Sequence, residues 1–120
     1  MSGPVPSKLV RLNELEGYEK GAKVRFLGCV DEYVVSEANL RLKHNYPPSN
    51  DAKTANVNIV HVLESIKRAN IDVGSWMNVI GYVERRKEKG IFVQAIAVWD
   101  AGNVDLVAYQ KAVEARKEAG

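Results

Sequence analysis

The stretch from Lys23 to Val35 limits the fold most strongly, because it is typical of one long β-strand that a glycine interrupts. Val24 and Phe26 alternate with charged residues, and β-branched residues continue as far as Val35. A stretch of 13 residues is long for a straight strand, and glycine tolerates the geometry of a bulge. We therefore expect a strand that bends sharply at Gly28, as strands do when they curl around a small barrel.

The rest of the chain predicts further strands and two helices. The apolar lead-in from Leu9 to Leu15 is expected to pack on the domain in an extended form, and the residues Pro47–Thr54 predict a loop. Gly81 lies where a second strand must bend. The remaining strands are expected at Asn39–Tyr46, Val57–Val62, Trp76–Arg85 and Ile91–Trp99, with a short helix at Leu63–Ala69 and an amphipathic helix at Val104–Ala119.

This order of elements predicts an all-β domain with added helices. Five short strands, with a helix between the third and the fourth, match the five-stranded OB-fold barrel. A doubly wound α/β domain would need more helices, and a sandwich would not need the inserted one. We divide the chain into a flexible N-terminal tail at residues 1–8, a barrel at 9–102 and a C-terminal partner-binding helix at 103–120.

Composition excludes several classes of protein. A chain of 120 residues has room for one domain. Its longest apolar run, Ala95–Trp99, is far shorter than the about 18 residues that span a bilayer, and its N-terminus lacks the features of a secretory signal. We therefore expect an intracellular protein without a membrane span, and the single cysteine, Cys29, allows no internal disulfide. A net charge of +2 is too small to hold nucleic acid by bulk charge.

No catalytic constellation is present in the sequence. The glycine-rich nucleotide motifs, the nucleophile elbow and the zinc-protease motif are all missing. His61 and Glu64 could share one helical face, but they straddle a boundary between strand and helix, and a zinc site would need Cys29 or His44 from elsewhere. We expect a protein that is not an enzyme and that uses no cofactor or metal.

Two groups of basic residues are candidates for contact with a nucleic-acid single strand. In an OB-fold the ligand groove crosses the second and third strands between two loops, and both groups could border it. The candidate DNA-binding residues of the first group, on the second strand, are Arg41 and Lys43, with Tyr46 at the strand end. Those of the second group, in the connection between the fourth and fifth strands, are Arg85, Arg86 and Lys87. Alternatively, residues 85–89 are only a solvated turn. Trp76, Tyr82 and Trp99 are expected to pack on the barrel, which leaves few rings for base stacking, so the affinity for single strands should be modest. Because the remaining contacts are a few phosphate contacts, binding should be sensitive to salt and nearly independent of base sequence.

The C-terminal helix has a broad apolar side that must be covered. One interpretation places this side on the chain's own barrel. The other pairs it with a helix of a partner subunit. The pattern leaves both open.

Three segments resemble the family of the Ten subunit of the CST telomere complex: Gly21–Val30, Val73–Val83 and Asn103–Leu106. The likeness covers residues 18–117. It implies an OB-fold protein in a tight heterodimer with the Stn subunit, arranged like the two smaller subunits of replication protein A. It also implies a nuclear, telomeric complex with a large third subunit, which binds telomeric single-stranded DNA and assists DNA polymerase alpha-primase in complementary-strand fill-in.

The resemblance also implies residues of the partner interface. In the family the C-terminal helix contributes to the dimer contact, so Leu106, Tyr109 and Val113 become interface candidates, and Arg25 matches a basic position in the family's Arg-x-x-Gly run. The loop Pro47–Thr54 is longer than this family pattern. Two other functions stay open: a protein scaffold, like a small subunit of replication protein A, with little DNA contact, and an RNA-binding barrel that prefers strands with a 2′-hydroxyl.

Overall fold

The computed structural model describes residues 7–44, 53–66, 71–102 and 105–119, the last four by their backbone. The strands are β1 (Lys8–Leu9), β2 (Lys23–Val34), β3 (Asn39–Lys43), β4 (Thr54–Asn58), β5 (Trp76–Glu84) and β6 (Ile91–Asp100). The helices are α1 (Leu63–Ile66) and α2 (Leu106–Ala119), with short 3₁₀ helices η1 (Leu12–Gly17), η2 (Val35–Glu37) and η3 (Val60–Val62).

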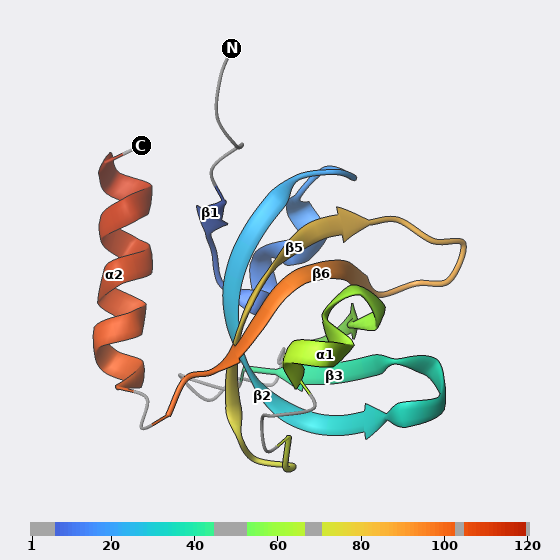
Figure 1. Ribbon diagram of the computed structural model, residues 1–120. Coiled ribbons are helices and arrows are strands. Elements are labelled where there is room, and N and C mark those ends of the chain that lie inside the picture. The colour runs from blue at the N-terminus through green and yellow to red at the C-terminus, as the bar shows by residue number, and fades with distance from the viewer. Residues whose placement is uncertain (1–6, 45–52, 67–70, 103–104, 120) are drawn as a thin grey trace, which may run out of the picture.

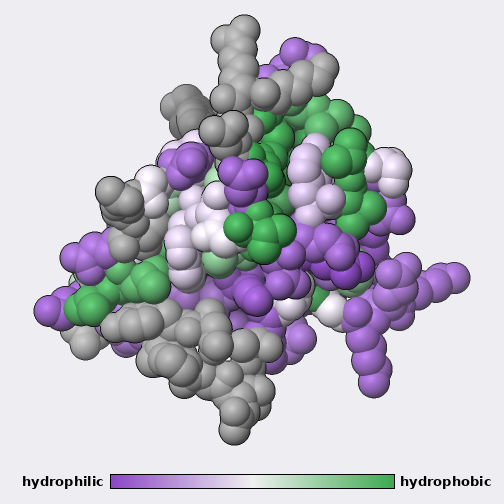
Figure 2. Space-filling model, turned by 90° about the horizontal axis from the view of Figure 1, so that it is seen from below, coloured by the Kyte–Doolittle hydropathy of each residue, from purple (hydrophilic) through white to green (hydrophobic). Residues whose placement is uncertain are grey.

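Five of these strands close into a barrel, which confirms the expected OB-fold. They follow the order β2-β3-β4-β6-β5, and pairing of β2 with β5 closes the ring. The pairs are antiparallel except for β4 with β6, while β1 adds to β2 in parallel. Helix α2 stands beside the barrel, next to β1 and β2 (Figure 1). Seen from below, hydrophilic side chains separate small groups of apolar ones on the described surface (Figure 2).

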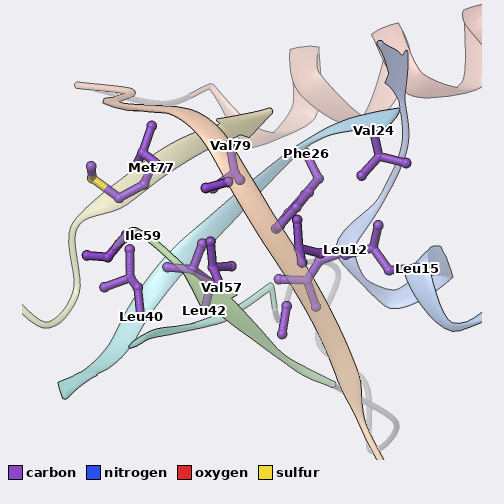
Figure 3. Close-up of a cluster of buried hydrophobic side chains, with 14 of the residues drawn as sticks. Leu12, Leu15, Val24, Phe26, Leu40, Leu42, Val57, Ile59, Met77 and Val79 are labelled. Carbon is purple, nitrogen blue, oxygen red and sulfur yellow. The ribbon is translucent and has the colours of Figure 1, made fainter. Parts of the chain in front are cut away.

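The lead-in closes one part of the core. It begins in the expected extended form, with Leu9 in β1, but from Leu12 it forms the 3₁₀ helix η1. Leu12 and Leu15 are three residues apart, so they lie on the same side of the 3₁₀ helix η1. Figure 3 shows both leucines pointing into the core near Phe26 and Val24, and both are fully buried. The prediction was wrong here because the Arg11 amide donates to the Glu14 carboxylate at 3.0 Å, a capping contact that starts a helical turn.

Two glycines allow close approach between strands. A Cβ atom on Gly28 would lie 2.7 Å from the Leu42 Cβ, and one on Gly81 would lie 2.4 Å from the Gln94 carbonyl oxygen. Gly81 adjoins a register shift between β5 and β6, as the expected bend requires. In β2 the register shift falls at Asp31, between Val30 and Glu32, three residues after Gly28, where the sequence predicted a bend.

Strand β4 is displaced from its expected range, Val57–Val62. It begins at Thr54 and ends at Asn58. The Asn58 side-chain oxygen accepts the Val60 amide at 2.9 Å, and this local contact turns the chain out of the ladder into η3. Most of the predicted Pro47–Thr54 loop lies outside the described residues.

Candidate nucleic-acid groove and partner surface

An open groove crosses the outer face of β3, β4 and β6. Leu40 and Leu42 point into the core, so strict alternation turns Asn39 and Arg41 outward. The groove has a volume of about 420 Å³. The residues that line it are Glu37, Asn39, Arg41, Asn56, Asn58, Arg86, Glu88 and Phe92.

Acidic neighbours offset the basic residues of this region. Arg41 lies 3.3 Å from the Glu32 carboxylate, across the β2–β3 pair. Lys43 lies 3.0 Å from Asp31, whose hydrogen bond raises the pKa of the lysine. Arg86 lies 3.4 Å from a Glu84 oxygen, and two further glutamates, Glu37 and Glu88, line the groove itself. The described part of the groove is therefore lined by mixed charge rather than by basic residues alone.

An aromatic ring that the sequence analysis missed lies at the bottom of the groove. Phe92 is opposite Asn56 in the parallel β4–β6 pair, and both line the groove. The Arg86 guanidinium carbon lies 4.8 Å from the centroid of the ring. The alternation of the strand could have predicted this position, because Ile91 and Val93 point inward and Phe92, which lies between them, then points outward.

The structure brings only some of the predicted DNA-binding residues together. Arg41 and Arg86 line the groove, while Lys43 lies further along β3 beside Asp31. Lys87 is exposed in the β5–β6 connection. The Arg85 guanidinium instead donates to the backbone carbonyls of Glu16, at 2.8 Å, and Tyr18, and so ties β5 to η1. Tyr46 lies outside the described residues.

Helix α2 is attached to the barrel by Tyr109, whose hydroxyl bonds backbone groups where β2 has no neighbouring strand on one side. Leu27 lies between the residues of β2 that pair with β1 and those that pair with β3. Its amide donates to the Tyr109 hydroxyl at 3.1 Å, and this hydroxyl donates to the Val10 carbonyl at 2.9 Å. His44 Nδ1 lies 3.2 Å from the Leu27 carbonyl oxygen. Both polar groups of the Leu27 backbone are thereby satisfied.

Burial is the main cause of the pKa shifts of Tyr109 and His44. It raises the pKa of Tyr109 to about 12, against a weaker opposing effect of the Leu27 backbone hydrogen bond. It lowers the pKa of His44, again against its bond to Leu27. The His44 ring lies 5.1 Å from the Trp76 ring and 5.6 Å from the Tyr109 ring, between centroids. The His44 ring therefore contacts both other rings, and Trp76 packs against a barrel residue as expected.

The barrel covers two of the three interface candidates on the helix, Tyr109 and Val113, which at these positions favours the interpretation that places the apolar side on the chain's own barrel. Val113 is fully buried within the chain, and Tyr109 is held by the backbone bonds above. An ion pair between Arg11 and Glu114 adds to the attachment. Leu106 is half-buried, whereas Val107 is 49% exposed.

A second set of apolar residues lies exposed on the outer side of β5 and β6. Met77 and Val79 of β5 point into the core, so Ile80 and Tyr82 point outward. We call Ile80, Tyr82, Ile96 and Trp99 the apolar face. The last three are each between 37% and 42% exposed, so the expectation that Tyr82 and Trp99 pack against the barrel is corrected.

A bulge and an arginine complete this face. Ala95 and Ala97 pair with Gly81 and Ile80, which leaves Ile96 unpaired in the register shift. The Arg25 guanidinium carbon lies 5.3 Å from the centroid of the Trp99 ring, and Arg25 pairs with Ile80 across β2 and β5. Arg25 therefore borders the apolar face.

The candidate zinc and thiol residues do not form a site. Among the described residues no group of three or more histidine, cysteine or acidic side chains could hold a metal. Cys29 is half-buried, and burial raises the pKa of its thiol. No helix within the described ranges is long and apolar enough to cross a membrane.

The model of the Ten1 family, described as telomere capping, CST complex subunit, matches residues 1–114. The chain belongs to the Ten1 family. Protein ten1 of Schizosaccharomyces pombe is 28% identical over 112 residues, which cover 93% of this chain and 95% of that protein. The chain is thus a telomere-capping subunit of the CST type, and the resemblance found in its sequence is confirmed.

Solved structures agree with the fold of this Ten1-family chain. A chain in the crystal structure of the S. pombe Stn1-ten1 complex matches with a TM-score of 0.77 and 25% identity, over 98% of both chains. The U. maydis Replication protein A bound to ssDNA matches with a TM-score of 0.64 and 19% identity, over 92% of this chain and 88% of that one. This second likeness concerns the fold alone.

Proposed function

We propose that this chain forms a heterodimer with an Stn1-type subunit and acts in a nuclear CST complex at telomeres. The observation that carries the proposal is the likeness, over 98% of both chains, to a chain of the S. pombe Stn1-ten1 complex. In this role the chain is not an enzyme. It offers surfaces to its partner, to a large third subunit and to telomeric single-stranded DNA, and through the complex it supports fill-in by DNA polymerase alpha-primase.

The apolar face, together with Arg25 and Val107, is the surface we propose for the Stn1-type partner. Aromatic residues and arginine are the side chains that contribute most to protein interfaces. Trp99 and Arg25 already lie against each other, so the partner would meet a partly ordered pair. Tyr109 and Val113 act indirectly in this arrangement, because they hold α2 in place, and Leu106 lies at the start of that helix.

Variants of the exposed residues test this surface. Trp99→Ala and Val107→Glu should each weaken binding of an Stn1-type subunit by about tenfold or more, measured by calorimetry. Val35→Glu is the matched control, since Val35 is exposed in η2, outside the surface. Unchanged partner affinity in both variants would show that the interface lies elsewhere.

We further propose that the groove contacts single-stranded DNA, with Arg41 and Arg86 inside it and Lys43 and Lys87 beside it. Its support is the place of the groove across β3 and β4, the strands that bind ligands in OB-folds. The ion pairs with Glu32 and Glu84 imply a weak interaction, because a phosphate must compete with a carboxylate for each arginine.

The same ion pairs favour a second candidate function, a protein scaffold with little direct DNA contact. The heterodimer can distinguish the two. Arg41→Glu should weaken single-strand binding by about tenfold if the groove contacts DNA. An unchanged affinity supports the scaffold, and a preference for a ribose strand of the same sequence supports an RNA-binding barrel.

A further inference from the structure

The covering of Phe92 is unusual for a residue on the outer face of a strand. Its neighbours Ile91 and Val93 belong to the main core cluster, and Phe92 lies outside that cluster. The residue is nevertheless only 8% exposed. Arg86 lies over it at 4.8 Å, and a Cβ atom on Gly90 would lie 3.4 Å from its Cε2 atom. The β5–β6 connection therefore covers the ring from outside.

Arg86 is itself open to the groove. Its side chain is 44% exposed, although it lies over Phe92 and contacts Glu84. A guanidinium is planar and weakly hydrated, and it stacks on aromatic rings. With Phe92 on one side, the exposed part of Arg86 is accessible to a planar group in the groove.

The walls of the groove also offer uncharged amide groups. Asn39, Asn56 and Asn58 line it. The Asn56 amide nitrogen donates to the Ile91 carbonyl at 3.3 Å, which orients its oxygen as an acceptor. Amide groups form the donor and acceptor pairs that base edges require.

The charges of the groove argue in the same direction. Two arginines and two glutamates line it, so a phosphate chain gains little net attraction there. A neutral, planar group that stacks and forms hydrogen bonds fits better.

We propose that Arg86 and Phe92 form a subsite for one unpaired nucleobase of single-stranded DNA. The base stacks on the open side of the Arg86 guanidinium, which Phe92 supports from below, and its edge meets the amides of Asn56 and Asn58. This inference rests on the proposed contact of the groove with DNA and specifies its chemistry: stacking and base edges rather than phosphates.

The test measures binding of fluorescent oligodeoxynucleotides to the full chain in complex with its Stn1-type partner. Arg86→Lys keeps the charge but removes the planar group, so we expect affinity to fall about fivefold or more, the effect of losing one stacked base, with an unchanged salt dependence. Arg85→Lys is the matched control. It makes the same substitution one residue away, at a side chain that bonds backbone carbonyls outside the groove.

A set of oligonucleotides, each with one abasic position, identifies the stacked base. One position should matter for the unchanged chain and lose its importance in Arg86→Lys. Phe92→Leu should reproduce the effect of Arg86→Lys, provided that circular dichroism shows an intact fold. Equal affinity of Arg86→Lys and the unchanged chain would overturn the inference even where DNA binding itself persists. Absence of DNA binding by the unchanged complex would overturn the DNA contact as well, and would leave the heterodimer standing.

Discussion

At Leu27, the side chains of Tyr109 and His44 bond the backbone amide and carbonyl, as a neighbouring strand does elsewhere in the barrel. Tyr109→Phe removes the hydroxyl that bridges Leu27 and Val10, so a buried amide loses its acceptor. We expect the free energy of unfolding to fall by about 1–3 kcal/mol, measured by urea denaturation. Tyr82→Phe, at an exposed tyrosine, is the control. Equal stability of the two variants would contradict the bridging role.

The buried His44 should make the stability of the chain depend on pH. Burial lowers the pKa of His44 below its ordinary value of 6.5, so the folded state favours the neutral ring. Its contribution to stability is complete above pH 6.5 and is lost as the pH falls from there toward the folded pKa. Urea denaturation between pH 7.5 and pH 5.5 should show this loss in the unchanged chain and a smaller loss in His44→Gln. Parallel curves for the two proteins would contradict the prediction.

Among the elements, the β5–β6 pair depends on the absence of one side chain. Gly81→Ala would place a methyl group 2.4 Å from the Gln94 carbonyl oxygen, so the bulge must shift. We expect a cost of about 1–3 kcal/mol and a lower melting temperature. Gly17→Ala, where nothing lies within 4 Å of the added atom, should melt close to the unchanged chain. A similar loss in both variants would mean that crowding at Gly81 is not the cause.

Sequence periodicity predicted the elements best where burial alternates. The ranges of β2, β5 and β6 follow the apolar alternation closely. The ends of β4 and the form of η1 did not follow it, because single polar contacts of Asn58 and Glu14 decided them. Such local bonds compete with ladder pairing by small free energies, which a pattern of apolar residues does not record.

On the scale of the whole molecule, the groove and the proposed partner surface share no residue. The groove lies over β3, β4 and the beginning of β6, and the apolar face lies over β5 and the later part of β6. We expect Val107→Glu to weaken only partner binding and Arg41→Glu only DNA binding. The double variant should show each effect at the size it has in the single variant. Calorimetry with the partner and anisotropy with DNA check this. Loss of partner binding in Arg41→Glu would show that the surfaces are coupled.

The candidate site was predictable in part. Charge and alternation placed Arg41 and Arg86 on the groove side, as the structure does. Neither could show that Glu32 and Glu84 pair with them, that Arg85 turns to backbone carbonyls, or that Arg86 covers Phe92. These contacts depend on strand register and on the path of the β5–β6 connection.

By itself the sequence determined the ring of five strands, the inserted helix and the family, because alternation, glycine positions and helical spacing are properties of neighbouring residues. Only the tertiary structure decided which surfaces stay open. Tyr109 and Leu27 are 82 positions apart, yet their contact attaches α2 to the barrel and buries Val113. The partner of a polar atom across such a separation is set by how the whole chain closes, and no local pattern contains that information.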